Sequence, residues 1–245
     1  MGREASVARR RFFVDGIEDG RAELHGENAR HLTRVLRVAP GQLFEISDNR
    51  AAYLAEIAEA RGGRVVFRVI EPLAAAAMPV EITLCAALVK FDRFEWMVEK
   101  ATELGAARVQ PVEAERSEKG LFAAAARRRE RWVRIARESS QQARRVTAPE
   151  ILPAQPFART VRLEAPFRYF LEEAAAPPFL RALPSTRPAG AHAALLAGPE
   201  GGWTDAERES AAAAGWQPVS LGPLVLRAET AAMAALAILL NAWIP

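Results

Sequence analysis

Two glycine-rich loops near the C-terminus constrain the fold of this chain most strongly. The first is Gly198-Pro199-Glu200-Gly201-Gly202, which follows the short apolar run Ala193–Ala197. The second is Leu221-Gly222-Pro223, which lies shortly before a long apolar segment. An apolar run that ends in glycine is typical of a buried parallel strand, and glycine adopts backbone angles that side chains forbid. Because ligands bind at the carboxyl ends of strands in α/β sheets, the two loops predict one shared small-molecule pocket.

A helix is expected directly after the first loop. Thr204 and Glu207 have the spacing of a capping box, in which the Thr hydroxyl accepts from the Glu amide and the Glu side chain reaches back. The sequence contains neither a Gly-x-Gly-x-x-Gly fingerprint nor a phosphate loop that ends in Gly-Lys-Ser/Thr. These absences argue against a dinucleotide dehydrogenase and against a P-loop NTPase.

Composition excludes further classes of protein. The chain has 245 residues, of which 50% are hydrophobic, so it exceeds one average domain and can form a large core. Cys85 is the single cysteine, which excludes an intrachain disulfide and Cys-based metal sites and fits a reducing compartment. The three histidines lack ligand spacing, so we expect no metal. The longest apolar run, Ala231–Leu240, is too short to span a bilayer, and we expect a soluble cytoplasmic protein with no membrane partner.

The first 72 residues have the pattern of a small β-barrel. Four strands are expected, and turn signals separate them: Phe12–Val14, Leu43–Ser47, Tyr53–Ala58 and Val65–Ile70. We expect one helix at Glu27–Arg37, with Leu32, Val35 and Leu36 on its apolar side. The basic residues of this region are either a solvated face or contacts for RNA phosphates; they include Arg10, Arg11, Arg30, Arg34 and Arg37.

Beyond a linker at residues 73–79, strands and helices alternate. The strands are expected at Val80–Leu88, Val109–Val112 and Phe167–Glu172, with a loop at Lys90–Arg93 and a helix at Phe94–Leu104 that Gly105 terminates. On that helix, Trp96 and Met97 are expected in the core. The last helix, Ala228–Trp243, is apolar nearly all round and must be covered on several sides.

A basic helix is expected in the middle of the chain. Residues 119–145 contain Lys119 and eight Arg against Glu130 and Glu138, a local charge of +7 (nine minus two). Trp132, Ile135, Ala136 and Ser139 have the spacing of a buried stripe, which leaves Arg127, Arg131 and Arg134 exposed. Such a face is either simply solvated or a track for RNA phosphates. The overall net charge of +3 favours an anionic partner only weakly.

Taken together, these motifs resemble the RsmE family of 16S rRNA uridine-N3 methyltransferases, which belongs to the SPOUT superfamily. The resemblance rests on both glycine loops and on four further segments, Arg10–Phe13, His31–Arg37, Lys90–Gly105 and Leu226–Thr230. Phe91 and Arg144 stand where the family usually has Gly. The resemblance implies an α/β fold with a C-terminal trefoil knot at 80–245, preceded by a PUA-like RNA-binding β-barrel at 1–72. It also implies a homodimer.

The same resemblance implies S-adenosyl-L-methionine as the cofactor. The implied substrate is N3 of a uridine in the decoding region of 16S rRNA, within the assembled small ribosomal subunit. The implied cofactor-binding residues are Leu196, Gly198, Pro199, Glu200, Gly201, Gly202, Leu221, Gly222, Leu224, Leu226 and Thr230. Further candidates for RNA contact are Lys90, Arg93, Arg116 and Arg145.

Uracil N3 is protonated at neutral pH, so the site must assist loss of that proton and stabilise charge on the flanking carbonyl oxygens. Arg227 is the first choice for charge stabilisation. Either Glu229 or Glu200 could accept the proton or orient the methionine end of the cofactor. Two alternatives remain: a SPOUT methyltransferase that acts on another RNA, and an RNA-binding homologue that has lost activity.

Overall fold

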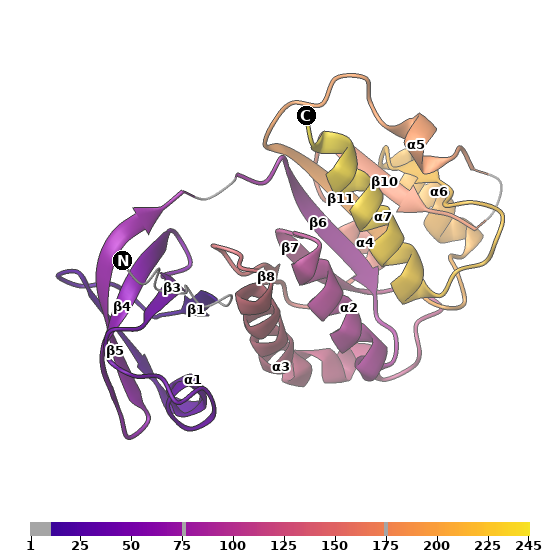
Figure 1. Cartoon of the computed structure of the whole chain (residues 1–245). Helices are drawn as coiled ribbons and strands as arrows, with labels where there is room; N and C mark the ends of the chain where they lie inside the picture. The colour runs from indigo at the N-terminus through magenta and orange to yellow at the C-terminus, as the bar shows by residue number, and fades with distance from the viewer. Residues whose placement is uncertain (1–10, 75–76, 174–175) are drawn as a thin grey trace. The chain divides into compact units, whose positions relative to one another are not determined.

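The structure, a computed structural model, describes residues 11–74, 77–173 and 176–245 (Figure 1). The chain divides into two compact units. The first comprises Met1–Ala76 and Ser140–Ala148, and the second comprises Ala77–Ser139 and Pro149–Pro245. Of the residues discussed above, Arg10 lies outside the described ranges.

The first unit is built on a five-stranded sheet in the order β1-β3-β4-β5-β2. Its strands are β1 (Arg11–Phe13), β2 (Arg21–His25), β3 (Leu43–Ser47), β4 (Ala52–Arg61) and β5 (Arg64–Leu73). Strand β1 runs parallel to β3, and the other pairs are antiparallel. The four predicted strands are confirmed. Strand β2 was missed because its five residues carry only two apolar side chains, Ala22 and Leu24, on its buried face.

The helix predicted at Glu27–Arg37 forms in a modified shape. An α-helix, α1 (Gly26–Arg30), continues into a π-helix, η1 (His31–Val35), in which the amide of Leu36 donates to the carbonyl of His31. Leu32 is fully buried as predicted, but Val35 is 65% exposed and Leu36 is 47% exposed. The predicted apolar stripe is wrong for these two residues because the wider turn of a π-helix shifts the angular spacing on which the stripe was based.

Residues 140–148 group with the first unit although they lie far along the sequence from the rest of it. Ser47 Oγ donates to the carbonyl of Val146 over 2.6 Å, and Asn49 Oδ1 accepts from the amide of Ala148 over 2.8 Å. Arg144 forms an ion pair with Glu45. We had expected residues 80–245 to form one continuous domain, and the sequence pattern held no signal for this excursion.

The second unit is built on a seven-stranded sheet in the order β12-β10-β11-β6-β7-β8, with β9 also paired to β7. All its strand pairs are parallel. The strands are β6 (Val80–Ala87), β7 (Arg108–Glu113), β8 (Glu150–Ile151), β9 (Gln155–Pro156), β10 (Phe167–Leu171), β11 (Ala191–Ala197) and β12 (Gln217–Val219). The strands predicted at β6, β7, β10 and β11 are confirmed, whereas the very short β8, β9 and β12 were missed.

Within the described residues, six helices accompany this sheet. They are α2 (Phe91–Glu103), α3 (Leu121–Gln142), α4 (Phe157–Thr160), α5 (Phe179–Ala182), α6 (Asp205–Ala213) and α7 (Ala228–Trp243). Helix α7 has the predicted bounds, and the capping box of α6 is present. Helix α2 begins at Phe91, so the loop predicted for Lys90–Arg93 is wrong beyond Lys90. On α2, Met97 is buried as predicted, but Trp96 is 44% exposed.

Gly105 ends α2 as predicted. Its φ of 85° is left-handed, its amide donates to the carbonyl of Thr102, and the amide of Ala106 donates to the carbonyl of Ala101. These two bonds are the Schellman pattern, which satisfies carbonyls at the end of the helix. On α3, the predicted buried residues Trp132, Ala136 and Ser139 are buried, and Ile135 is half-buried.

Both faces of the parallel sheet are covered, as such sheets require. Helices α2 and α7 pack side by side over one face, where Leu84, Leu195 and Leu236 are fully buried (Figure 1). The other face is covered by α4 and α6 and carries a second cluster that includes Phe170 and Trp203. None of the helices within the described ranges is long and apolar enough to cross a membrane.

Candidate active site

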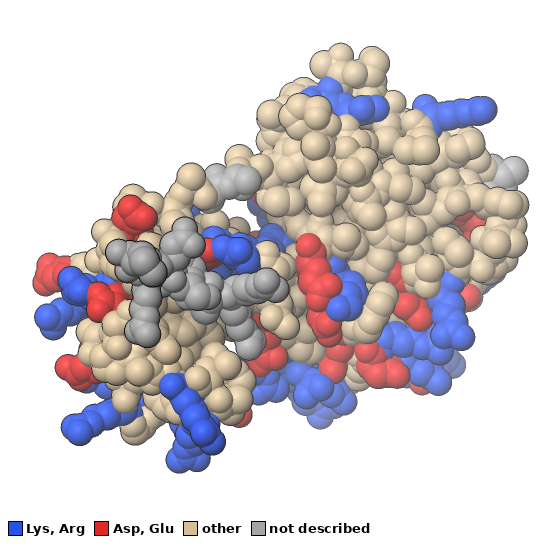
Figure 2. Space-filling model, in the orientation of Figure 1, with Lys and Arg blue, Asp and Glu red and all other residues tan. Residues whose placement is uncertain are grey.

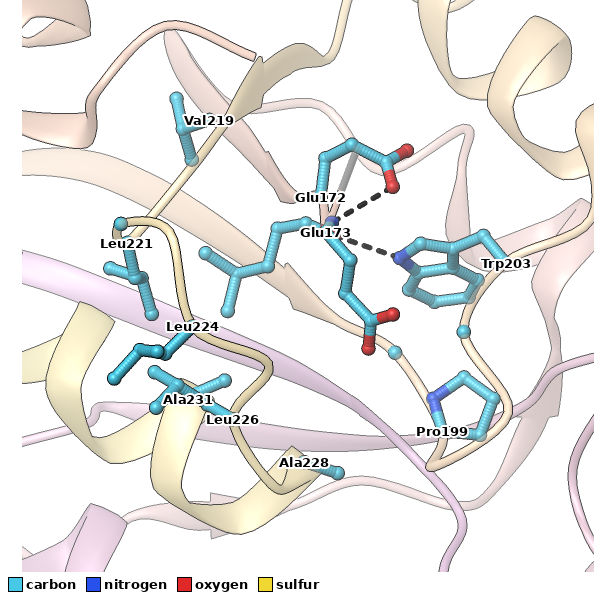
Figure 3. Close-up of a pocket in the computed structure, with 14 residues that line it drawn as sticks. Glu172, Glu173, Pro199, Trp203, Val219, Leu221, Leu224, Leu226, Ala228 and Ala231 are labelled. Carbon is cyan, nitrogen blue, oxygen red and sulfur yellow. Dashed lines mark hydrogen bonds between the residues drawn. The ribbon is translucent and has the colours of Figure 1, made fainter. Parts of the chain in front are cut away.

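A cleft opens at the carboxyl ends of three neighbouring parallel strands, β12, β10 and β11 (Figure 3). Its empty volume is about 600 Å³, including solvent at its mouth. The two glycine loops meet here, as their sequence pattern predicted. The lining consists of Leu171, Glu172, Glu173, Gly198, Pro199, Gly202, Trp203, Val219, Leu221, Gly222, Leu224, Leu226, Ala228 and Ala231.

Most of the predicted cofactor-binding residues lie in this lining: Gly198, Pro199, Gly202, Leu221, Gly222, Leu224 and Leu226. Four of them lie outside it. The side chain of Leu196 is fully buried in the core, and Thr230 is exposed on α7. Glu200 is paired with Arg93, and the carbonyl of Gly201 accepts from Arg116.

The lining also contains residues that sequence reasoning missed, above all Glu172 and Glu173 at the end of β10. Both residues reach the cleft because β10 lies between β11 and β12, so that the carboxyl ends of the three strands share one edge of the sheet. The strand order cannot be read from the sequence, which is why the two glutamates were missed.

Gly198 is required by close packing. A Cβ at this position would lie 2.9 Å from Cε2 of Trp203, whose side chain is fully buried. The Trp203 ring stacks on Phe170 with 4.9 Å between centroids, and its Nε1 donates to the carbonyl of Leu171 over 3.0 Å. Trp203 therefore fixes the path of the first glycine loop. Gly222 is required by its backbone, since its φ is 129° and no atom lies within 4 Å of its Cβ position.

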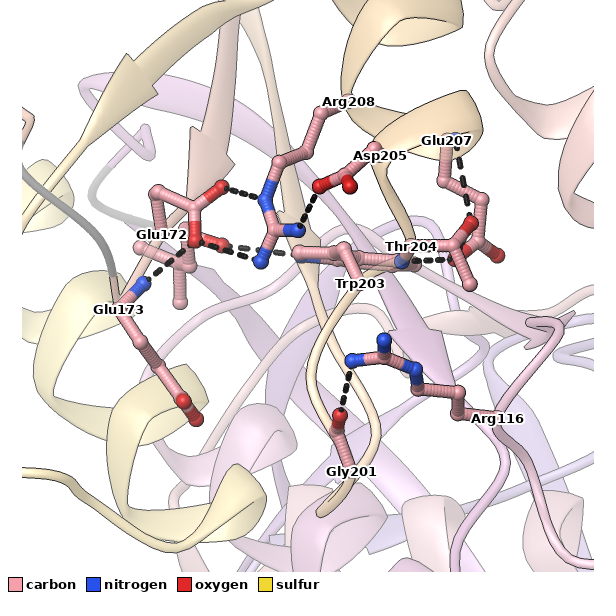
Figure 4. Close-up of polar contacts among 10 residues, drawn as sticks. Arg116, Glu172, Glu173, Gly201, Trp203, Thr204, Asp205, Glu207 and Arg208 are labelled. Carbon is pink, nitrogen blue, oxygen red and sulfur yellow. Dashed lines mark hydrogen bonds and ion pairs between the residues drawn. The ribbon is translucent and has the colours of Figure 1, made fainter.

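Polar contacts hold the first loop in place (Figure 4). Arg116 Nη1 donates to the carbonyl of Gly201 over 2.8 Å. Glu207 closes the capping box with Thr204 and also accepts from the amide of Glu115 over 2.9 Å. The loop is thus tied to the segment after β7. Arg116, predicted to contact RNA, uses one guanidinium nitrogen for this structural contact.

The two glutamates after β10 differ in their surroundings. Glu172 accepts from Arg208 at 2.6 Å and 3.2 Å, and Arg208 also pairs with Asp205 at 3.0 Å (Figure 4). The hydrogen bond to Glu172 raises the pKa of Arg208 above its ordinary value. Glu173, in contrast, directs its carboxylate into the cleft (Figure 3).

The three predicted catalytic residues are placed differently. Arg227 is the exposed N-cap of α7, between Leu226 and Ala228, which both line the cleft. Glu229 follows in the first turn of α7, and its buried Oε2 has no hydrogen-bond partner among the described residues. Glu200 is exposed and paired with Arg93.

Comparison with known proteins identifies the family. The family described as RNA methyltransferase domain matches residues 76–240, and the RNA methyltransferase PUA domain matches residues 24–70. The ribosomal RNA small subunit methyltransferase E of Synechocystis is 35% identical over 231 residues, which are 88% of this chain and 70% of that protein. That of Bacillus subtilis is 30% identical over 92% of this chain and 94% of its own.

This chain belongs to the methyltransferase E family. The predicted resemblance is thereby confirmed, and so is the assignment as an rRNA methyltransferase. Two solved structures agree in fold. Methyltransferase E from Neisseria gonorrhoeae, bound to S-adenosyl methionine, has a TM-score of 0.85 at 29% identity, with 96% of this chain and 98% of that chain covered. A Legionella pneumophila putative methyltransferase with bound SAM also has a TM-score of 0.85 at 29% identity, with coverage of 95% and 97%.

In the first unit of this chain, two of the residues predicted to contact RNA are largely buried or bonded within the protein. Arg11 is 7% exposed, and its guanidinium bonds to Glu45 and to the carbonyl of Arg144, so it is a buried structural residue and cannot meet a phosphate directly. Burial lowers the pKa of Arg145 to about 10, and its Nε donates to the carbonyl of Thr147. Arg30, Arg34 and Arg37 are exposed.

Arg30 and Arg34 border a hollow of about 860 Å³, solvent included, whose other side is formed by the β4–β5 turn. That turn contains Gly62 and Gly63, with φ values of 55° and 83°. The exposed backbone of the turn and the two guanidinium groups could together contact a phosphate.

In the second unit, the basic candidates other than Arg116 lie on α2, on α3 and in the loop before α2. Lys90, Arg127 and Arg134 are exposed, and Arg131 is exposed but paired with Glu95 at 2.7 Å. Figure 2 shows that Lys and Arg side chains here are interspersed with Asp and Glu, whereas the region around α7 is largely uncharged. No group of three His, Cys, Asp or Glu side chains that could hold a metal is found in residues 11–74, 77–173 and 176–245.

Proposed function

We propose that this protein uses S-adenosyl-L-methionine to methylate N3 of a uridine in the decoding region of 16S rRNA. The observation that carries the proposal is the cleft where the two glycine loops meet, with Arg227 at its edge. Family membership supports the reaction class, and the cofactor named for the Neisseria relative supports the cofactor.

The lining of the cleft fits such a cofactor. Leu171, Val219, Leu221, Leu224 and Leu226 offer apolar surface for an adenine ring. Gly198 and Gly222 carry no side chain of their own, so a ligand in the cleft can approach the backbone of both turns closely. The bound cofactor supplies a methyl group on a sulfonium, and no metal is needed for its transfer.

Arg227 is the proposed group for charge stabilisation. Its backbone begins α7 beside the cleft, and its long exposed side chain can reach an incoming base. A guanidinium can donate to the uracil oxygen that gains charge as N3 loses its proton, an interaction that is stronger in the transition state than in the ground state.

Glu229 is the better candidate for proton acceptor. One of its carboxylate oxygens is buried and unpartnered within the described chain, whereas Glu200 is held by Arg93. The carboxylate of Glu200 is therefore already engaged by the guanidinium of Arg93. Glu200 is then a residue that orients the first loop.

RNA contact is proposed for the exposed arginines of both units, Arg30, Arg34, Arg37, Arg127 and Arg134. We also propose that the enzyme acts in the cytoplasm on the assembled small subunit, that the second unit carries a trefoil knot, and that it forms a homodimer. The homodimer is supported by exposed apolar residues of the second unit, among them Leu180 at 69%, Leu224 at 78% and Val225 at 78%.

The catalytic role is tested with Arg227→Ala. Single-turnover methylation of small subunits should fall about a hundredfold, the scale of losing one donor to a developing charge, while cofactor affinity stays within a few-fold. Arg227→Lys should recover only part of the rate because it lacks the planar fork. Arg159→Ala, at another exposed arginine of the same unit, is the matched control. A loss of cofactor binding at unchanged rate constant would make Arg227 structural.

The substrate is tested by mapping methylated nucleotides in rRNA from a strain that lacks the gene. We expect one uridine of 16S rRNA to lose its N3-methyl group and to regain it when the purified enzyme is added to small subunits. Loss of a methyl group from another RNA, with 16S rRNA unchanged, would reject the proposed substrate but keep the reaction. Binding of RNA without any methyl transfer would indicate an inactive homologue.

A further inference from the structure

Two adjacent glutamates at the end of β10 have different roles: Glu172 forms a structural ion pair with Arg208, and Glu173 faces the cleft. The side chain of Glu172 is only 7% exposed, and both of its oxygens accept from Arg208. Its charge is therefore neutralised locally. The amide of Glu173 donates to Glu172 Oε1 over 2.9 Å, which fixes the backbone of Glu173 where its side chain leaves the strand end.

Glu173 brings an uncompensated negative charge to the cleft. Within the described residues its carboxylate forms no ion pair and no side-chain hydrogen bond, and none of the residues that line the cleft is Lys, Arg or His. Its Oε2 lies 3.8 Å from the position that a Cβ of Gly202 would occupy, so it stands over the first glycine loop (Figure 3). A carboxylate placed in this way attracts a cation and repels an anion.

We propose that Glu173 is a specificity-determining residue that recognises positive charge on the cofactor. The inference rests on the proposed cofactor site. S-adenosyl-L-methionine carries two cationic groups, the sulfonium and the α-ammonium, and the cleft offers them one free carboxylate. The adenosine part of the cofactor, which is neutral, gains nothing from this charge.

The test compares three ligands by calorimetry with wild type and Glu173→Gln. S-adenosyl-L-methionine carries both cations and an α-carboxylate, S-adenosylhomocysteine keeps the ammonium and the carboxylate but has no sulfonium, and 5′-methylthioadenosine carries none of these charges. The variant should bind S-adenosyl-L-methionine about fivefold more weakly, as expected for a charge pair open to solvent, and should bind methylthioadenosine within twofold of wild type. S-adenosylhomocysteine shows which cation Glu173 contacts. A fivefold loss of its affinity in the variant indicates the ammonium, and unchanged affinity indicates the sulfonium.

Glu164→Gln is the matched control, because Glu164 is an exposed glutamate of the same unit just before β10. It should leave all three affinities unchanged. An equal loss for all three ligands in Glu173→Gln would show contact with the ribose or a structural role, and unchanged affinity for S-adenosyl-L-methionine would also overturn the proposal. Failure of the proposed cofactor site is distinguishable, since the wild type would then bind none of the three ligands.

Discussion

Substitution of Gly198 by Ala tests how tightly the cleft is built. The new methyl group would lie 2.9 Å from Cε2 of Trp203, which is closer than real Cβ contacts, and 3.0 Å from Nε1 of the same ring. Trp203 cannot retreat easily. Phe170 stacks on its ring, Phe157 lies 5.3 Å away between centroids, and its Nε1 is bonded to the carbonyl of Leu171.

The expected cost follows from these contacts. Inserting a methyl group into a filled core costs about 1–3 kcal/mol, and a shift of the indole that breaks its buried hydrogen bond adds to it. We expect the free energy of unfolding to fall by about 2 kcal/mol, which is roughly 4–8 °C in melting temperature for a chain of this size. Cofactor affinity should fall as well, because Gly198 and Trp203 both line the cleft.

Urea unfolding followed by tryptophan fluorescence measures the effect, with Gly16→Ala as control because no atom lies within 4 Å of its Cβ position and its φ is not left-handed. Trp203→Phe removes the two clashing indole atoms. In the Gly198→Ala background it should therefore cost at least about 1 kcal/mol less than it does in the wild type, a coupling typical of residues in contact. A Gly198→Ala protein within about 0.5 kcal/mol of wild type, or additive effects of the two substitutions, would refute the steric argument.

Three further predictions concern other parts of the chain. Gly222→Val should abolish cofactor binding in calorimetry while circular dichroism shows a folded protein, because the branched side chain of valine would enter open space in the cleft. Unchanged cofactor affinity in this variant would show that the cofactor binds elsewhere. Arg11→Met should lower the free energy of unfolding in urea by about 3 kcal/mol, because it leaves the buried carboxylate of Glu45 with one partner. Arg144→Gly should change the free energy of unfolding by no more than about 1 kcal/mol, because glycine relieves the strain of a left-handed φ of 55°. Equal losses of stability in the two variants would contradict this. Burial lowers the pKa of His192, so the unfolded chain binds the proton more readily and stability should fall as the pH drops below about 6.5; His192→Gln should flatten unfolding free energies measured from pH 8 to 5.

Local signals in the sequence were enough to predict the centre of the second unit. A continuous apolar stretch has to be buried, and this alone indicated the strands β6 and β11 and the extent of α7. The capping box at Thr204 and the helix end at Gly105 depend on atoms within a few residues of each other. The residues that form such features are close together in the sequence, so the sequence pattern is enough to predict them.

Features that depend on distant partners could not be predicted. Arg11 was interpreted as part of either a solvated face or a set of phosphate contacts, but its guanidinium bonds to Glu45 and to the carbonyl of Arg144. Arg144 itself occupies a position where the family resemblance led us to expect Gly, and its left-handed φ explains that preference. Its ion pair with Glu45 is the contact that offsets the strain of a non-glycine residue at this point.

The different roles of Glu172 and Glu173 show that the composition of the site depends on the register of the sheet as well as on the sequence motifs. Side chains alternate between the two faces of a strand, and on β10 Phe170 joins the cluster under α6 while Leu171 joins the cluster under α7. Continuing the alternation sends Glu172 toward Arg208 of α6 and Glu173 toward the cleft. Because Phe170 is held opposite Leu196 of β11, a slip of one residue would exchange the two glutamates. The pairing of β10 with β11 thus decides which carboxylate is free to meet a ligand, and no local motif at Glu172 or Glu173 carries that information.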